Sequence, residues 1–155
     1  MAVHCLRCGK TRRGQIRRPC STPNCHGQSI PYPRNMKKVV HLYHSLGYEI
    51  ESAYALHPIV PYEDGSFDET VFVCLSFARL YDDDAFPGLP PEFQILHFEP
   101  ENSTRLSYYI EYYMGTDATS MAKKDTQMAI NKLWKYGENI RSQGLHWVLQ
   151  LGGRL

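Results

Sequence analysis

Four of the five cysteines lie close together near the N-terminus, in two pairs with short spacings. The first pair is Cys5 and Cys8, followed by Gly and Lys, and the second pair is Cys20 and Cys25. Two close pairs joined by a short loop show the spacing of metal ligands rather than of disulfides. Four thiolates suit the tetrahedral coordination of Zn²⁺, so the pattern predicts one Zn²⁺ per chain. Because this segment has almost no apolar residues, metal binding would also supply its folding energy.

Residues 3–27 resemble the zinc-ribbon class of small zinc modules. The resemblance implies four ligands, Cys5, Cys8, Cys20 and Cys25. The second pair departs from the class, because four residues separate its cysteines where two are commoner. His26 and His4 lie next to ligand cysteines and are therefore candidates for a substitute ligand. No family is recognised for the rest of the chain.

Three other uses of these cysteines stay open beside zinc. Two disulfides are disfavoured by the odd number of cysteines and by the expectation of no secretory signal. A redox Cys-x-x-Cys is disfavoured because no strand–helix pattern surrounds residues 5–8. An iron–sulfur cluster also uses four thiolates. The fifth cysteine, Cys74, has apolar neighbours and is predicted to be a small buried residue.

Charge is divided unequally along the chain. Residues 1–48 contain nine Lys or Arg and no acid, whereas residues 49–155 contain all 16 acids against eight Lys or Arg. So basic a segment is the usual footprint of phosphate binding. The residues predicted to contact nucleic acid or another anionic partner are Lys10, Arg12, Arg13, Arg17, Arg18, Lys37 and Lys38. The alternative is that the basic segment docks on the acidic part of its own chain.

Hydrophobic periodicity predicts an α+β domain over 35–155, preceded by a zinc-binding module over 1–28 and a linker over 29–34. Helical spacing predicts one helix over 36–46 and a second one that Asp117 or Thr119 caps and Gly144 ends. The predicted strands are 48–56, 70–78, 93–99, 105–114 and 146–151, with loops over 58–67 and 81–91. Short connections favour a mainly antiparallel sheet with the helices on one face, in the order α-β-β-β-β-α-β.

The strand predicted over 105–114 is rich in tyrosine and alternates between two faces. Leu106 and Tyr108 belong to the face predicted to join the core. The opposite face holds the possible interface residues Arg105, Tyr109 and Tyr113, because tyrosine provides contact area at low entropic cost. The alternative is that helices cover this face too.

The remaining polar clusters have simpler interpretations. Asp82, Asp83 and Asp84 predict a solvated acidic loop, since three consecutive carboxylates rarely converge on one ion. His41 and His44 share a helical face with lysines and predict a basic outer surface. No catalytic residue is predicted, because the chain has no Gly-rich phosphate loop, nucleophile elbow or His-Glu-x-x-His motif.

These patterns favour a zinc-binding protein whose basic N-terminal module binds nucleic acid in a regulatory, non-catalytic role. The main alternative is a regulator or inhibitor that binds an acidic protein through the basic module and the tyrosine-rich sheet. An enzyme with an unrecognised site is the third hypothesis. No stretch reaches 18 consecutive apolar residues, so we expect no membrane span and a cytoplasmic location.

Overall fold

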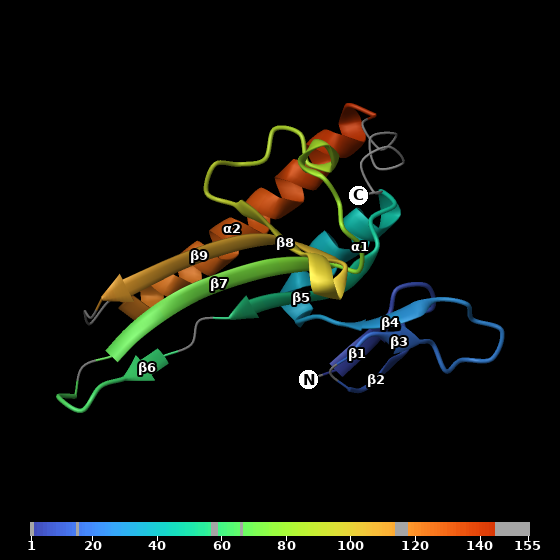
Figure 1. The fold of residues 1–155 in the computed structure, drawn as a ribbon. Helices are drawn as coiled ribbons and strands as arrows, with labels where there is room; N and C mark the ends of the chain where they lie inside the picture. The colour runs from blue at the N-terminus through green and yellow to red at the C-terminus, as the bar shows by residue number, and fades with distance from the viewer. Residues whose placement is uncertain (1, 15, 57–58, 66, 114–117, 145–155) are drawn as a thin grey trace.

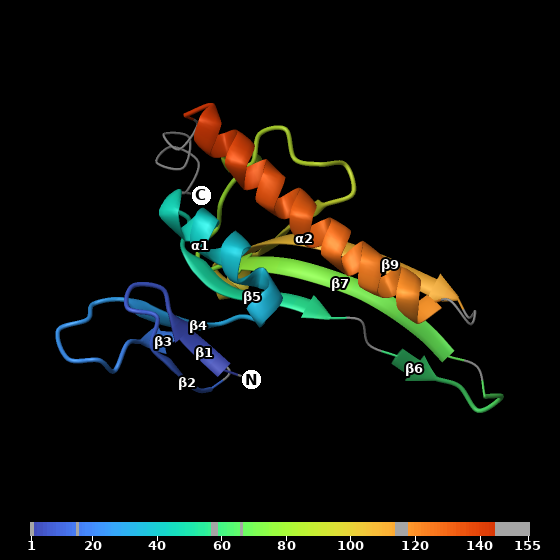
Figure 2. The same cartoon turned by 180° about the vertical axis from the view of Figure 1, so that it is seen from behind.

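The protein is described here by a computed structural model, which covers residues 2–14, 16–56, 59–65, 67–113 and 118–144. This part of the chain forms two antiparallel sheets and two α-helices (Figure 1). Both helices lie on the same face of the larger sheet (Figure 2). The predicted α+β class, with a small N-terminal sheet ahead of the main sheet, is therefore confirmed.

The small sheet is built by the cysteine-containing segment. Its strands are β1 (Ala2–Cys5), β2 (Thr11–Arg13), β3 (Arg18–Pro19) and β4 (Gln28–Pro31), in the order β2-β1-β4-β3. β4 lies where a linker was expected, and it pairs with β1 and β3. The strands on both sides of this extended segment supply hydrogen-bond partners for its backbone N–H and C=O groups. The division of the chain into domains stays a prediction.

The larger sheet is centred on one long strand. Its strands are β5 (Ile50–Leu56), β6 (Ile59–Pro61), β7 (Phe67–Phe77), β8 (Gln94–Phe98) and β9 (Ser103–Tyr113). The order is β5-β7-β9-β8, and β6 pairs with β7 beyond the end of β5. The central strand predicted over 70–78 is confirmed as part of β7. The loop predicted over 58–67 is corrected, because Ile59–Pro61 within it pair with β7 as β6.

The helices bury the residues that the periodicity indicated. The helical elements are η1 (Arg34–Met36), α1 (Lys37–Ser45), η2 (Asp83–Ala85), η3 (Glu99–Glu101) and α2 (Ala118–Ser142). Residues at helical spacing along α2 are buried, including Ala122, Leu133 and Gly137. Asp117 and the strand predicted over 146–151 lie outside the described residues.

An aromatic cluster fills the core between the helices and the sheet. Tyr48 stacks on Phe86 with ring centroids 5.3 Å apart, and its hydroxyl donates to the Ala85 carbonyl at 2.6 Å. The Tyr43 hydroxyl donates to the Leu133 carbonyl at 2.8 Å, so α1 and α2 are joined by a buried hydrogen bond. The same core extends into the small sheet through Ile30 of β4 and into the segment after it through Tyr32, both of which are buried. Packing therefore couples the two sheets.

Candidate metal centre

The four N-terminal cysteines converge on one point in the small sheet. Their Sγ atoms all lie within 4.8 Å of one another. The Sγ–Sγ distance is 3.7 Å between Cys5 and Cys25 and 3.6 Å between Cys8 and Cys20. Bonds of about 2.3 Å in a tetrahedron place sulfur atoms about 3.8 Å apart, whereas a disulfide needs about 2.05 Å. The four thiols are free and their spacing suits one tetrahedral metal ion.

The first pair of cysteines is positioned by the turn that follows β1. The amide of Gly9 donates to the Cys5 carbonyl at 2.9 Å, and Gly9 has a φ of +76°, which favours glycine. The turn aims the amide of Cys8 at the Cys5 Sγ atom, 3.5 Å away. An amide dipole pointing at sulfur stabilises a thiolate, as a metal ligand requires.

The wider spacing of the second pair is accommodated by a turn. The amide of Cys25 donates to the Thr22 carbonyl at 3.1 Å, and Asn24 takes a left-handed conformation with φ 60°. Asparagine tolerates this conformation better than most residues. The amide of Thr22 also reaches the Cys20 Sγ atom at 3.4 Å. The four intervening residues thus return the chain to the cluster, and no substitute ligand is needed to close it.

The two histidine candidates have other positions. The metal-type cluster found among the described residues contains the four cysteines and neither histidine. His4 stacks on Tyr32 with centroids 4.4 Å apart, and its Nδ1 atom is 2.9 Å from the Thr11 hydroxyl. His26 is exposed beside the cluster. His4 therefore connects the small sheet to its neighbouring segment.

The thiols of the cluster differ in their pKa values. Hydrogen bonds from Thr22 lower the pKa of Cys20 to about 6. The amide of Gly27 lowers the pKa of Cys25, but desolvation and the neighbouring thiols outweigh it and raise that pKa to about 11. Like charges this close repel, so a set of four thiolates is costly by itself. A divalent cation between them removes that cost, and the donor set therefore fits a metal ion.

Gly27 is a structural residue of this centre that the sequence analysis did not single out. A Cβ atom added there would lie 2.7 Å from the Cys5 Sγ atom and 2.6 Å from the Cβ of Arg7. Cys5 is fully buried, so its sulfur has little room to move away. The sequence signal for this residue was a glycine two positions after Cys25. Only the contact with Cys5 and Arg7 in the folded chain shows why no side chain fits there.

Gly27→Ala is expected to weaken metal binding about 10- to 100-fold, the range seen when residues that support metal ligands are changed. The added methyl group would push the Cys5 sulfur out of the cluster. A titration against a chromophoric zinc chelator measures the affinity. Gln28→Ala, at the next residue and the first of β4, is the matched control and should leave the affinity unchanged. Equal affinities for the two variants would contradict this role of Gly27.

The basic residues of the small sheet are divided between its two faces. Directly opposed residues share a face, so Arg12 and Arg18 lie on the Cys5 side, and Arg13 lies with His4. The Arg12 guanidinium donates to the Pro19 carbonyl and that of Arg18 to the Arg13 carbonyl, each at 2.9 Å. Two of the predicted binding arginines therefore also brace the module.

The other predicted anion-binding residues differ in their surroundings. Lys10, Arg13, Lys37 and Lys38 are exposed, and Arg17 is half-buried beside the cleft that separates the small sheet from α1. Lys37 lies close enough to His4 and His41 to reinforce the lowering of their pKa values by desolvation. The positive charge of α1 therefore adjoins the face of the small sheet that carries Arg13.

The tyrosine-rich strand leaves one tyrosine exposed. Tyr109 is 58% exposed, whereas Leu106 and Tyr108 are buried in the core as predicted. Arg105 lies over the ring of Phe98, with its Cζ atom 4.4 Å from the centroid. The side chain of Tyr113 lies outside the described residues. The face predicted as an interface is thus open at Tyr109.

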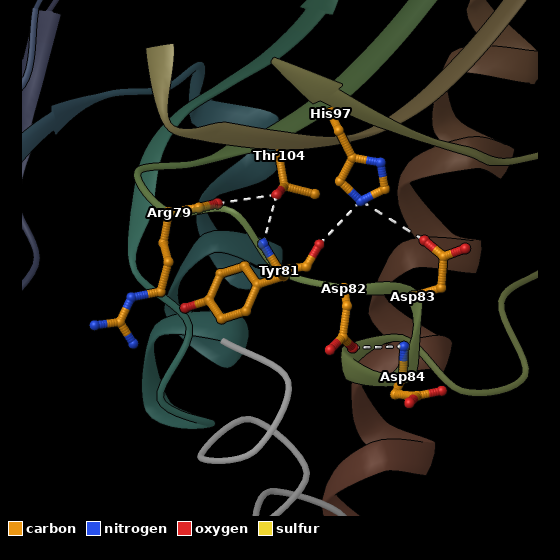
Figure 3. Close-up of polar contacts among 7 residues, drawn as sticks. All are labelled: Arg79, Tyr81, Asp82, Asp83, Asp84, His97 and Thr104. Atoms are coloured by element: carbon orange, nitrogen blue, oxygen red, sulfur yellow. Dashed lines mark hydrogen bonds and ion pairs between the residues drawn. The ribbon is translucent and has the colours of Figure 1, made fainter. Parts of the chain in front are cut away.

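The acidic loop is organised by its own hydrogen bonds (Figure 3). The Asp82 carboxylate caps η2 by accepting from the amide of Asp84 at 2.9 Å. His97 bridges the loop, with its Nε2 atom 2.9 Å from the Tyr81 carbonyl and 3.6 Å from an Asp83 oxygen. Asp83 and Asp84 are exposed, which confirms the prediction of a solvated acidic loop.

Fold and site together define an α+β protein with a small antiparallel module that carries a four-cysteine cluster, consistent with a zinc-ribbon-like module. No known protein family, curated protein or solved structure matches the chain. Among the described residues, no helix is both long enough and apolar enough to span a membrane.

Proposed function

We propose that the chain binds one Zn²⁺ through Cys5, Cys8, Cys20 and Cys25 and that the module around this ion binds nucleic acid. The support for zinc is the cluster of four thiols at distances that match tetrahedral coordination. Zinc in a closed four-thiolate site has a structural role, because no coordination position is left for a substrate. The proposed role of the metal is therefore to hold the basic module in its folded shape.

The observation that carries the nucleic-acid proposal is the unpaired charge of the N-terminal segment. In the part of the chain that the structure describes, every ion pair involves residues from 49 onward. None of the nine Lys and Arg side chains of residues 1–48 has a carboxylate partner there. This argues against the alternative in which the basic segment docks on acids of its own chain. A polyanion would supply the missing counter-charge.

The exposed side chains are the best candidates for phosphate contacts. Lys10 and Arg13 extend from the small sheet, and Lys37 and Lys38 extend from the first turn of α1. Arg12 and Arg18 already donate to backbone carbonyls, so replacing them would combine a change in binding with a change in the module. A clean test therefore uses the exposed residues.

Lys10→Gln/Arg13→Gln is expected to weaken nucleic-acid binding and to lower the slope of log affinity against log salt by up to about 0.9 per lost contact on duplex DNA. Zinc content should stay unchanged, because the four-cysteine cluster includes neither residue. Fluorescence anisotropy with labelled oligonucleotides over about 50–200 mM salt measures both quantities.

The control for this experiment is Lys123→Gln/Lys124→Gln, which removes the same charge from two exposed positions of α2. Its salt dependence should match that of the unmodified protein. Failure of the unmodified protein to bind either single-stranded or duplex nucleic acid at low salt would contradict the proposal.

A protein partner is the second candidate function, and the exposed side chains of the sheet favour it. Tyr109, Leu56 and Leu96 are all exposed on the larger sheet. An aromatic side chain with apolar neighbours is a common anchor of protein interfaces. Such binding would depend little on salt, so the same salt titration separates the two candidates.

A further inference from the structure

A groove separates the start of α1 from the middle of α2. Its volume is about 560 Å³, and it is lined on one side by Arg34, Lys37 and Lys38. The opposite wall comes from α2 and includes Asn131 and Trp134. The helices that form the two walls pack on the same face of the larger sheet (Figure 2). The groove thus combines a cationic wall with an aromatic one.

The charge of the groove has a single sign. Three cationic side chains line it, and no carboxylate is found among its described lining residues. None of the three cations forms an ion pair within the described part of the chain. Lys37 also lies close enough to His4 of the small sheet to act on it electrostatically, so the positive potential continues toward the proposed nucleic-acid-binding module. The groove is therefore suited to an anionic ligand that extends beyond it.

The aromatic wall presents an unusual residue for a solvent-facing position. Trp134 is 40% exposed, although large aromatic rings gain most when they are buried. Ile130, one helical turn earlier on α2, is buried and also lines the groove. Asn131 and Gln127 both line the groove, and the Gln127 amide donates to the Asn131 side-chain oxygen at 3.0 Å. An exposed indole beside amides and cations can stack on a flat polar ring.

We propose that this groove binds single-stranded nucleic acid, with one base stacked on Trp134 and the flanking phosphates on Lys37 and Lys38. The inference rests on the proposed function and specifies which form of nucleic acid this groove binds. Grooves that bind single strands combine basic side chains along the backbone with aromatic platforms for the bases. Bases in a duplex are already stacked on one another, so Trp134 has no base face to contact there.

The test uses the full-length, zinc-loaded protein with Trp147→Phe, which leaves Trp134 as its only tryptophan. Oligothymidylate of about 12 nucleotides and a duplex of equal length are the probes. The single strand should quench the Trp134 fluorescence, and the duplex should not. Trp134→Ala should weaken single-strand binding about tenfold, with little change for the duplex. Trp134→Phe should keep most of the affinity because a phenyl ring also stacks.

The charged wall is tested by Lys37→Gln/Lys38→Gln, which should lower the salt slope for the single strand by about 0.7 per residue. Lys123→Gln/Lys124→Gln is the matched control, because it removes the same charge from exposed positions of α2 that do not line the groove. Its binding should be unchanged.

Two outcomes would overturn the inference, and they are distinguishable from failure of the proposed function. Unchanged single-strand affinity in Trp134→Ala, together with weaker binding in Lys10→Gln/Arg13→Gln, would overturn the groove and leave the module as the binding surface. Quenching by polyglutamate but not by oligothymidylate would assign the groove to an acidic protein. Absence of all nucleic-acid binding by the unmodified protein would instead overturn the proposed function itself.

Discussion

Removal of zinc is expected to unfold residues 2–27 while the two helices remain folded. This segment buries few apolar side chains of its own, chiefly Val3 and Cys5. Structural zinc sites contribute an apparent free energy of about 10–16 kcal/mol, which a short segment without a core cannot replace. Hydrogen exchange of the protein with and without a strong chelator should show loss of protection in β1 and β2, which both lie within this segment. Elemental analysis should find one zinc ion per chain before chelation.

Cys5→Ser is expected to have the same effect without chelator, because Cys5 is the most buried of the four ligands. Cys74→Ala is the matched control. Cys74 is equally buried but lies in β7, away from the cluster, so its replacement should leave the zinc content at one per chain. Metal-free protein with undiminished protection in β1 would contradict the assignment of a structural metal centre.

A chain that starts at Arg34 is expected to fold cooperatively but to lose about 3–6 kcal/mol of unfolding free energy relative to the 155-residue chain. The periodicity after residue 34 supports an independent core, yet the structure places Ile30 and Tyr32 in that core as well. Burying one large apolar side chain contributes about 1.5–3 kcal/mol, and this chain lacks two. Urea denaturation followed by circular dichroism measures the difference.

A chain that starts at Gln28 provides the comparison, because it lacks all four ligand cysteines but keeps both core residues. Its stability should be closer to that of the full-length protein. If both truncated chains show no cooperative transition, the division into a metal module and an α+β domain is wrong. If both match the full-length protein, Ile30 and Tyr32 contribute less than their burial indicates.

Local patterns were enough to predict the elements whose residues are close in sequence. The helix over 36–46 followed from the spacing of Met36, Val39, Val40 and Tyr43, all of which are buried in the structure. The central strand followed from an unbroken apolar run, and β7 is paired on both sides. These predictions succeed because hydrophobic periodicity reports directly on which faces are buried.

The elements that the sequence analysis missed depend on partners far along the chain. Gln28–Pro31 was interpreted as part of a linker because of the two prolines in this region. In the structure it forms β4, which pairs with strands on both sides. Ile59–Pro61 reads as a loop and extends the sheet only because β7 continues beyond β5. Pairing of this kind depends on the position and length of the partner strands, which local propensity does not encode.

By itself, the sequence determined the chemistry of this protein, namely four thiols at metal-ligand spacing and a basic segment without acids. Ligand type and net charge are properties of the residues themselves, so they can be read from the sequence without knowledge of the fold. Only the tertiary structure decided how those residues are used. It placed Gly27 against the Cys5 sulfur, engaged Arg12 and Arg18 within the module, and brought Trp134 opposite Lys37. Each of these relations joins atoms that come close only when the chain has folded, because packing between separate elements creates them.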